Sequence, residues 1–218
     1  MRILRFQAVT LMVCVGLLFV GQSGVQGAGN MPDELSVGAK APHFTLTSTQ
    51  GDKISLSGLL AAEETKAVVV QFISTRCPVS KAYDSRMVEL HKQYHGKGVR
   101  FIGVNSNTFP DRNFEDLEEM KLHADKVGIT YSVVKDKDSG VANMYGAMTT
   151  PHIYLLDATG HVRYVGAIDD SQNAGKVKKT YLMNALDELL EGKDVALSHT
   201  KSFGCSIKRN PKAMTVVQ

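Results

Sequence analysis

The sequence predicts an α/β fold, in which a central mixed β-sheet is flanked by helices and preceded by an N-terminal β-hairpin. A continuous apolar run over residues 68–73 is typical of a central strand that is buried on both faces. A helical pattern and a second apolar strand at residues 99–104 follow it, which predicts a right-handed βαβ unit with parallel strands. Alternating segments around turn residues, within 43–56 and 152–168, predict two antiparallel hairpins.

The first hairpin joins residues 43–46 to residues 53–56 through the turn sequence QGD. A helix should begin just after Cys77, because Pro78 suits a first helical turn, where a missing N–H costs nothing. Glycines at 96 and 98 end this helix. Its buried face is marked by apolar residues at helical spacing, namely Tyr83, Met87, Leu90 and Tyr94.

The second half of the chain continues the alternation of helices and strands. A second amphipathic helix is expected with Asn113 as its N-cap. A short strand at 131–134, a short helix at 139–145 and a hairpin of residues 152–156 with 162–168 follow. A last helix ends at Gly192. The apolar faces of these two helices comprise Phe114, Leu117, Met120, Ala124 and Val127 in one, and Leu182, Ala185, Leu186, Leu189 and Leu190 in the other.

Length and composition fit one soluble domain, since the chain has 218 residues, of which 43% are apolar and 22% charged. The formal net charge is +3, and it falls to +1 when Arg2 and Arg5 are removed with the N-terminal segment. So small a charge favours neither nucleic acid nor an anionic membrane as a partner.

The first 27 residues have the three regions of a secretory signal peptide. Two arginines precede an apolar stretch at residues 8–20, and small and polar residues lead to a cleavage site before Ala28. We therefore expect an exported protein, periplasmic or secreted, with no stable membrane anchor after cleavage. The alternatives are an uncleaved anchor and, more weakly, a lipoprotein modified at Cys14. The expected organisation is signal peptide 1–27, linker 28–35, domain 36–195 and a C-terminal tail 196–218 that carries Cys205.

Cys77 is the best candidate for a reactive group. It lies in the sequence STRCPVS at residues 74–80, where a central strand ends and a helix begins, and α/β proteins place their sites at this sheet edge. Unpaired N–H groups at a helix start favour a thiolate, and Arg76 would add positive charge. A thiolate attacks disulfides and peroxides. The alternative is a buried, inert cysteine.

The mature chain keeps one further cysteine, Cys205, because Cys14 leaves with the signal peptide. Ser80 stands where a Cys-x-x-Cys motif has its second cysteine, so Cys77 cannot close a local disulfide. Any intramolecular partner must then be Cys205, although a spare surface thiol is the alternative and the sequence does not show that the two pair.

The sequence predicts neither a metal site nor a cofactor. The chain has no Cys-x-x-Cys motif, Gly-rich phosphate loop or Gly-x-Ser-x-Gly elbow. His43, His123 and His152 are interpreted as ordinary polar or packing residues, of which His152 stands out because it follows Pro151 near the expected site.

Residues 36–210 resemble the peroxiredoxin-like redoxin branch of the thioredoxin superfamily, which is related to the alkyl hydroperoxide reductase and thiol-specific antioxidant proteins. Four segments carry the resemblance: VGAKAPHF at 37–44, FISTRCP at 72–78, TPHIYLLD at 150–157 and YVGAIDD at 164–170. The ending ALDELL at 185–190, followed by GCSIK at 204–208, is similar to this branch in particular.

The resemblance implies a thioredoxin-like fold and thiol redox chemistry. Ser74 and Cys77 match the hydroxyl and the cysteine of a peroxiredoxin motif, but Val70 replaces the motif's proline. Thr150 and Pro151 resemble the cis-proline site of a thioredoxin, where the backbone of Thr150 would be free to pair with an extended thiol substrate. The arginine that peroxiredoxins place just before the later strand is missing, which weakens the expectation of peroxidase activity.

The leading hypothesis is an exported thiol-dependent oxidoreductase. In it, Cys77 attacks a peroxide or a disulfide, Cys205 resolves the product, and an external thiol reductant restores both thiols. One alternative is a non-catalytic module that holds copper through Cys77 and a histidine. Another is a degenerate fold used for interaction, in which the disulfide is purely structural.

Overall fold

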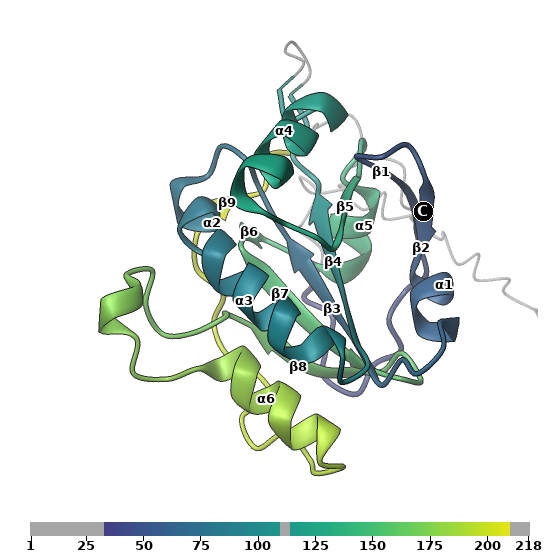
Figure 1. Ribbon diagram of the computed structural model, residues 1–218, viewed down its shortest axis with the longest axis vertical. Helices are drawn as coiled ribbons and strands as arrows, with labels where there is room; N and C mark the ends of the chain where they lie inside the picture. The colour runs from purple at the N-terminus through teal and green to yellow at the C-terminus, as the bar shows by residue number, and fades with distance from the viewer. Residues whose placement is uncertain (1–32, 110–113, 210–218) are drawn as a thin grey trace, which may run out of the picture.

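A seven-stranded mixed sheet forms the centre of the protein, with helices on both of its faces, as the sequence predicts (Figure 1). The computed structural model describes residues 33–109 and 114–209. The strand order in this sheet is β2-β1-β5-β4-β3-β7-β8, and β6 and β9 pair separately. The strands are β1 (Thr45–Ser48), β2 (Lys53–Ser55), β3 (Ala67–Phe72), β4 (Val99–Asn105), β5 (Ser132–Lys135), β6 (Thr149–Thr150), β7 (His152–Asp157), β8 (Val162–Gly166) and β9 (Cys205–Ser206).

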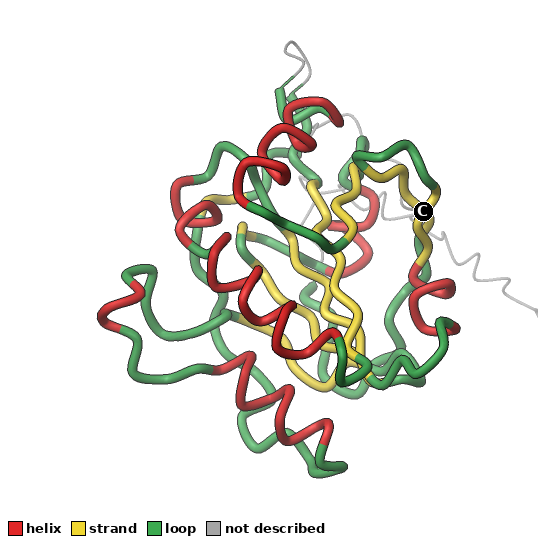
Figure 2. The backbone as a smooth tube through the Cα atoms, viewed as in Figure 1, coloured by secondary structure: helices red, strands yellow, loops and turns green. Residues whose placement is uncertain are grey.

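The helices are α1 (Leu56–Ala61), α2 (Pro78–Ala82), α3 (Asp84–His95), α4 (Leu117–Val127), α5 (Gly140–Tyr145) and α6 (Tyr181–Leu190). One face of the sheet packs against α3, α4 and α6, and the other against α1 and α5 (Figure 2). A short 3₁₀ turn, η1 (Ala174–Lys176), precedes α6. Both predicted hairpins are present, because β1 pairs with β2 and β7 pairs with β8, each antiparallel.

The central strand β3 organises the site edge of the sheet. All six of its residues are buried, and it pairs in parallel with β4 and antiparallel with β7. Strand β5 continues the parallel set beside β4. Because the carboxyl ends of parallel strands share one edge, the loops after β3 and β4 lie side by side.

Two helices, α1 and α4, differ from the sequence-based expectation. The second hairpin strand ends at Ser55, whose hydroxyl caps α1 by accepting from Gly58 N, so Leu56 begins a helix that was not predicted. Helix α4 begins at Leu117 with Asp116 as its cap, and the expectation of Asn113 as N-cap is wrong. The reason is local: Glu115 has a φ of 53°, which turns the chain out of helical geometry, and Asp116 accepts from Glu119 N. Asn113 itself lies outside the described residues.

The helix expected after Cys77 is interrupted at Tyr83, which ends α2 and precedes α3. The fully buried Tyr83 donates its hydroxyl to Asp169 Oδ1 at 2.9 Å. The guanidinium of Arg86 lies 3.7 Å from the centre of its ring, and Phe203 of the tail packs edge-on against it at 6.1 Å. Tyr83 therefore joins the start of α3, the segment after β8 and the C-terminal tail.

The polar tail is more ordered than its composition suggests. It first runs along β8, where Val165 N donates to Ser198 O of the tail and Val165 O accepts from Thr200 N, each at 3.0 Å. It then crosses to β6, with which β9 pairs antiparallel, as the yellow end of the chain in Figure 1 shows. This two-stranded sheet brings the tail to the start of α2.

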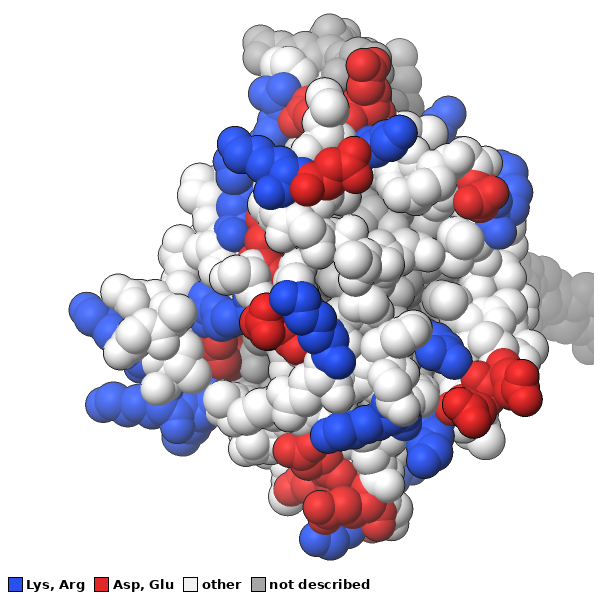
Figure 3. Space-filling view, in the orientation of Figure 1, with Lys and Arg blue, Asp and Glu red and all other residues white. Residues whose placement is uncertain are grey.

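Charged side chains of both signs are interspersed on the face that carries α3, α4 and α6 (Figure 3). The expected signal peptide, residues 1–27, lies outside the described residues. Within the described ranges, no helix is long and apolar enough to cross a membrane. The expected linker ends in contact with the domain, because Leu35 N donates to Tyr145 O at 3.0 Å.

Replacing Tyr83 by phenylalanine tests the junction between α2, the segment after β8 and the tail. Burial, with Asp169 beside it, raises the pKa of Tyr83, so its hydroxyl remains a donor. We expect Tyr83→Phe to lower the free energy of unfolding by about 1 kcal/mol, the net value of one hydrogen bond. Urea unfolding measures this free energy. Tyr181→Phe is the control, since Tyr181 is partly exposed and its hydroxyl makes no hydrogen bond within the described residues. Equal losses in both variants would contradict the role of Tyr83.

Candidate active site

Cys77 lies at the junction of the loop after β3 with α2. It is the N-cap of α2, and its Sγ lies 3.3 Å from Ser80 N, which donates to it. The same Sγ lies 3.3 Å from the carbonyl oxygen of Thr150. The side chain is only 4% exposed. The N–H group of Ser80 would stabilise negative charge on this sulfur once the cysteine is reduced.

The structure joins Cys77 and Cys205 in a disulfide with a Cα–Cα distance of 5.9 Å, across 128 residues of sequence. The pairing of β9 with β6 accounts for it, because Cys205 lies directly opposite Thr150 in the register. The neighbouring Gly204 has a φ of 153°, and a Cβ there would lie 2.1 Å from Thr150 O. Only glycine allows so close an approach of the two backbones.

The peptide bond between Thr150 and Pro151 is cis, as the resemblance implies. The expectation that the Thr150 backbone is free for an extended substrate does not hold in this state. The chain's own tail occupies that edge, with Thr150 paired to Cys205. Ile207 N extends the pairing by donating to Met148 O at 2.9 Å.

Ser80, in place of a second cysteine, supports the Cys77 loop. Its buried hydroxyl accepts from Ser74 N at 3.1 Å. Ser74 in turn accepts from Cys77 N at 3.0 Å through its own hydroxyl. The loop is therefore fixed by side-chain oxygens at both of its ends.

A buried acidic residue that the sequence analysis did not identify lies beneath this loop. Glu115 is 0% exposed, and its Oε1 accepts from Ser74 Oγ at 2.5 Å and from Arg76 N at 2.9 Å. Thr75 Oγ1 lies 3.2 Å from the same oxygen. The second oxygen, Oε2, accepts from Asn107 Nδ2 at 2.6 Å. Each of these four groups donates to the carboxylate.

Arg76 is directed away from the sulfur. Its guanidinium makes two hydrogen bonds with Glu119, at 3.0 and 2.9 Å, and lies 3.8 Å from the centre of the Phe114 ring. The carboxylate of Glu119 raises the pKa of Arg76, and Arg76 lowers that of Glu119. In the disulfide state the positive charge is therefore engaged with Glu119, and a catalytic role for Arg76 stays a prediction.

The histidine next to the cis-proline is packed in the core and contacts an acidic residue. His152 is fully buried, accepts from Met148 N at 3.3 Å through Nδ1, and has Nε2 3.0 Å from Glu34 Oε1. This contact is an ion pair only when the imidazole is protonated. Glu34 also binds His199 of the tail at 2.7 Å. Over the described part of the chain, no group of three His, Cys, Asp or Glu residues is arranged to hold a metal ion.

The AhpC/TSA family model matches residues 37–165, which is more than half of the chain. The chain belongs to the AhpC/TSA family. It is 28% identical over 178 residues to the thiol-disulfide oxidoreductase ResA of Bacillus thuringiensis (strain Al Hakam), across 81% of this chain and 95% of that protein.

Two solved structures are also similar. An uncharacterized conserved protein from Geobacillus kaustophilus is 34% identical, with a TM-score of 0.75 and coverage of 81% of this chain and 93% of that chain. A hypothetical protein from Sinorhizobium meliloti 1021 is 30% identical, with a TM-score of 0.74 and coverage of 82% and 97%. The family and the paired cysteines confirm the expected redoxin branch and a thiol oxidoreductase. Export and the use of peroxide stay predictions.

The pairing of Glu34 with two imidazole rings predicts an acid-sensitive contact. His152 and, to a smaller extent, His199 lower the pKa of Glu34 from its ordinary value of 4.5. A lowered pKa in the folded state means that the stabilisation is complete above about pH 4.5 and is lost as pH falls through the folded-state pKa. We expect the melting temperature of Glu34→Gln to fall less steeply than that of the wild type between about pH 5 and pH 3. Parallel curves would contradict this contact.

Proposed function

We propose that the protein is an exported thiol-disulfide oxidoreductase in which Cys77 is the nucleophile and Cys205 the resolving cysteine. The observation that carries the proposal is the Cys77–Cys205 disulfide, formed at a helix cap beside a cis-proline. The name of the similar Bacillus protein supports thiol–disulfide exchange as the reaction type. Thr150 and Pro151 are proposed to shape the approach to the sulfur.

The proposed cycle has two exchange steps. The Cys77 thiolate attacks one sulfur of a partner disulfide, which forms a mixed disulfide and releases the other partner sulfur as a thiolate. The Cys205 thiolate then attacks Cys77 Sγ, which releases the second partner thiol and leaves the internal disulfide. The partner gains two electrons, and an external dithiol later supplies two electrons to the Cys77–Cys205 disulfide and is itself oxidised to a disulfide.

A disulfide is a better candidate oxidant than a peroxide. Ser74 donates its hydroxyl hydrogen to Glu115, and Arg76 is engaged with Glu119, so neither donor is directed at the position that a peroxide oxygen would take beside Cys77. Peroxide ranks second because the family match and the Ser74–Cys77 spacing support it. In this cycle Ser74 orients the Cys77 loop, and Arg76 would affect the sulfur only after leaving Glu119.

Serine substitutions at the two cysteines test the cycle. We expect Cys77→Ser to abolish turnover of both a disulfide substrate and a peroxide. Cys205→Ser should carry out the first step and stop at a stoichiometric mixed disulfide on Cys77, visible by mass spectrometry of the intact protein. Turnover that persists in Cys77→Ser contradicts the proposal. A wild-type disulfide that mild dithiol cannot open in the folded protein favours a structural role instead.

Export rests on the N-terminal pattern and on the disulfide, because oxidising compartments allow such bonds to persist. We expect the protein recovered from its own cells to begin at Ala28, in the periplasm or the medium. Intact mass spectrometry of fractionated cells measures this. Protein that retains Met1 and stays in the cytoplasm would contradict export without affecting the redox assays.

A further inference from the structure

The tail beyond Cys205 is held by contacts that do not involve sulfur. Ile207 is 6% exposed and packs in the core on the α1 and α5 face of the sheet. The backbone of Lys208 makes two hydrogen bonds. Its N donates to the side-chain oxygen Oδ1 of Asn107 at 2.8 Å, and its O accepts from Thr108 N at 2.7 Å. Arg209 Nε donates to Asn143 Oδ1 at 2.8 Å. These contacts can hold the tail in place whether or not the disulfide is closed.

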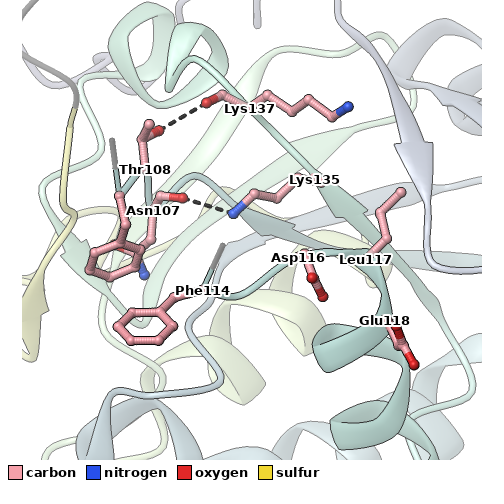
Figure 4. Close-up of a pocket in the computed structure, with 9 residues that line it drawn as sticks. Asn107, Thr108, Phe114, Asp116, Leu117, Glu118, Lys135 and Lys137 are labelled. Atoms are coloured by element: carbon pink, nitrogen blue, oxygen red, sulfur yellow. Dashed lines mark hydrogen bonds between the residues drawn. The ribbon is translucent and has the colours of Figure 1, made fainter. Parts of the chain in front are cut away.

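Asn107 connects this tail to the loop of Cys77. It is 5% exposed and follows β4 at the sheet edge that also carries Cys77. Its Oδ1 faces the N–H of Lys208 and its Nδ2 faces the carboxylate of Glu115, so only one orientation of the amide satisfies both groups. Its backbone oxygen accepts from Lys135 Nζ at 2.7 Å, within a hollow of about 460 Å³ (Figure 4).

Glu115 completes the connection on the other side. Its Oε1 accepts from Ser74 Oγ and Arg76 N, and Ser74 Oγ accepts from Cys77 N. A continuous chain of hydrogen bonds therefore runs from Cys77 through Ser74, Glu115 and Asn107 to Lys208, three residues after Cys205.

We propose that Asn107, supported by Glu115, is a positioning residue for the resolving step: it holds the reduced tail against the sheet so that the Cys205 thiol stays beside Cys77. This rests on the proposed two-cysteine cycle. Asn107 touches neither sulfur and acts through the backbone of the tail. The first step, attack by Cys77 on an outside disulfide, does not require the tail to be in place.

The proposal predicts a selective effect on the second step. With oxidised glutathione as the probe, Cys77 first forms a mixed disulfide and releases one glutathione thiolate. Cys205 then attacks Cys77 Sγ and releases the second. We expect Asn107→Ala to slow this closure about tenfold, the value of one or two hydrogen bonds. The rate of mixed-disulfide formation is measured in a Cys205→Ser background. Adding Asn107→Ala should change this rate by no more than about twofold, because the substitution is expected to affect only the position of the tail.

Acid quenching and mass spectrometry follow both steps in the folded, reduced protein. Asn184→Ala is the matched control, because it removes an exposed amide on α6 that accepts from Thr180 rather than from the tail. Asn107→Ser gives a second test if the alanine variant folds poorly. Its short hydroxyl cannot reach both Lys208 N and Glu115, so closure should slow in the same way.

Closure at the wild-type rate in both Asn107 variants overturns the proposal, and so does an equal slowing of both steps, which would indicate a general loss of structure. The outcome is separable from that of the proposed function. Normal closure in the Asn107 variants together with an inactive Cys77→Ser removes only the positioning role. Activity in Cys77→Ser removes the cycle itself.

Discussion

The arrangement of the site depends on a very short piece of antiparallel pairing, that of Thr150 with Cys205. In such a ladder a slip of one residue turns each side chain to the opposite face, so the register decides whether Cys205 faces Cys77 at all. Gly204 fixes this register, because its lack of a side chain lets the tail approach the Thr150 carbonyl. The backbone pairing of Thr150 with Cys205 is needed before the two sulfur atoms can meet, so the disulfide depends on it.

The parallel part of the sheet supplies the other half of this arrangement. Strands β3 and β4 end at the same edge, where one leads to Cys77 and the other to Asn107. Buried polar groups are costly unless they are paired, and here Glu115 pairs with donors from both loops. The carboxylate therefore makes the position of one loop depend on the position of the other.

The local features of the site could be predicted from the sequence. The apolar run before Ser74 and the proline after Cys77 indicate a strand–helix junction, which is where the structure places the cysteine. The resemblance implied the cis bond at Pro151, which the structure contains. Each of these signals lies within a few residues of the group that it locates.

The long-range contacts could not be predicted in the same way. Glu115 lies 40 residues from Thr75, and nothing in the surrounding pattern distinguishes a buried glutamate from a solvated one. Its positive φ also moved the start of α4 from the expected Asn113 to Asp116. Asn107 had a usable signal, because it follows a strand parallel to β3. The strand in the tail had no such signal, since two polar residues carry too little pattern to predict a strand. Only Cys205 itself was a candidate there.

Exposure and leaving-group stability together favour attack by a reductant on one of the two sulfur atoms of the internal disulfide. Cys205 is partly exposed, whereas Cys77 is 4% exposed and lies under the N–H of Ser80. A reductant reaches the Cys205 sulfur more easily, and attack there expels Cys77 as the thiolate that the helix cap stabilises. In the proposed cycle, the sulfur that leaves is then the nucleophile of the next turnover. In contrast, attack on Cys77 would have to reach the less exposed sulfur and would expel the less stabilised thiolate. The pairing of the tail with β6 therefore brings the two cysteines together and also leaves Cys205 as the sulfur that a reductant reaches more easily.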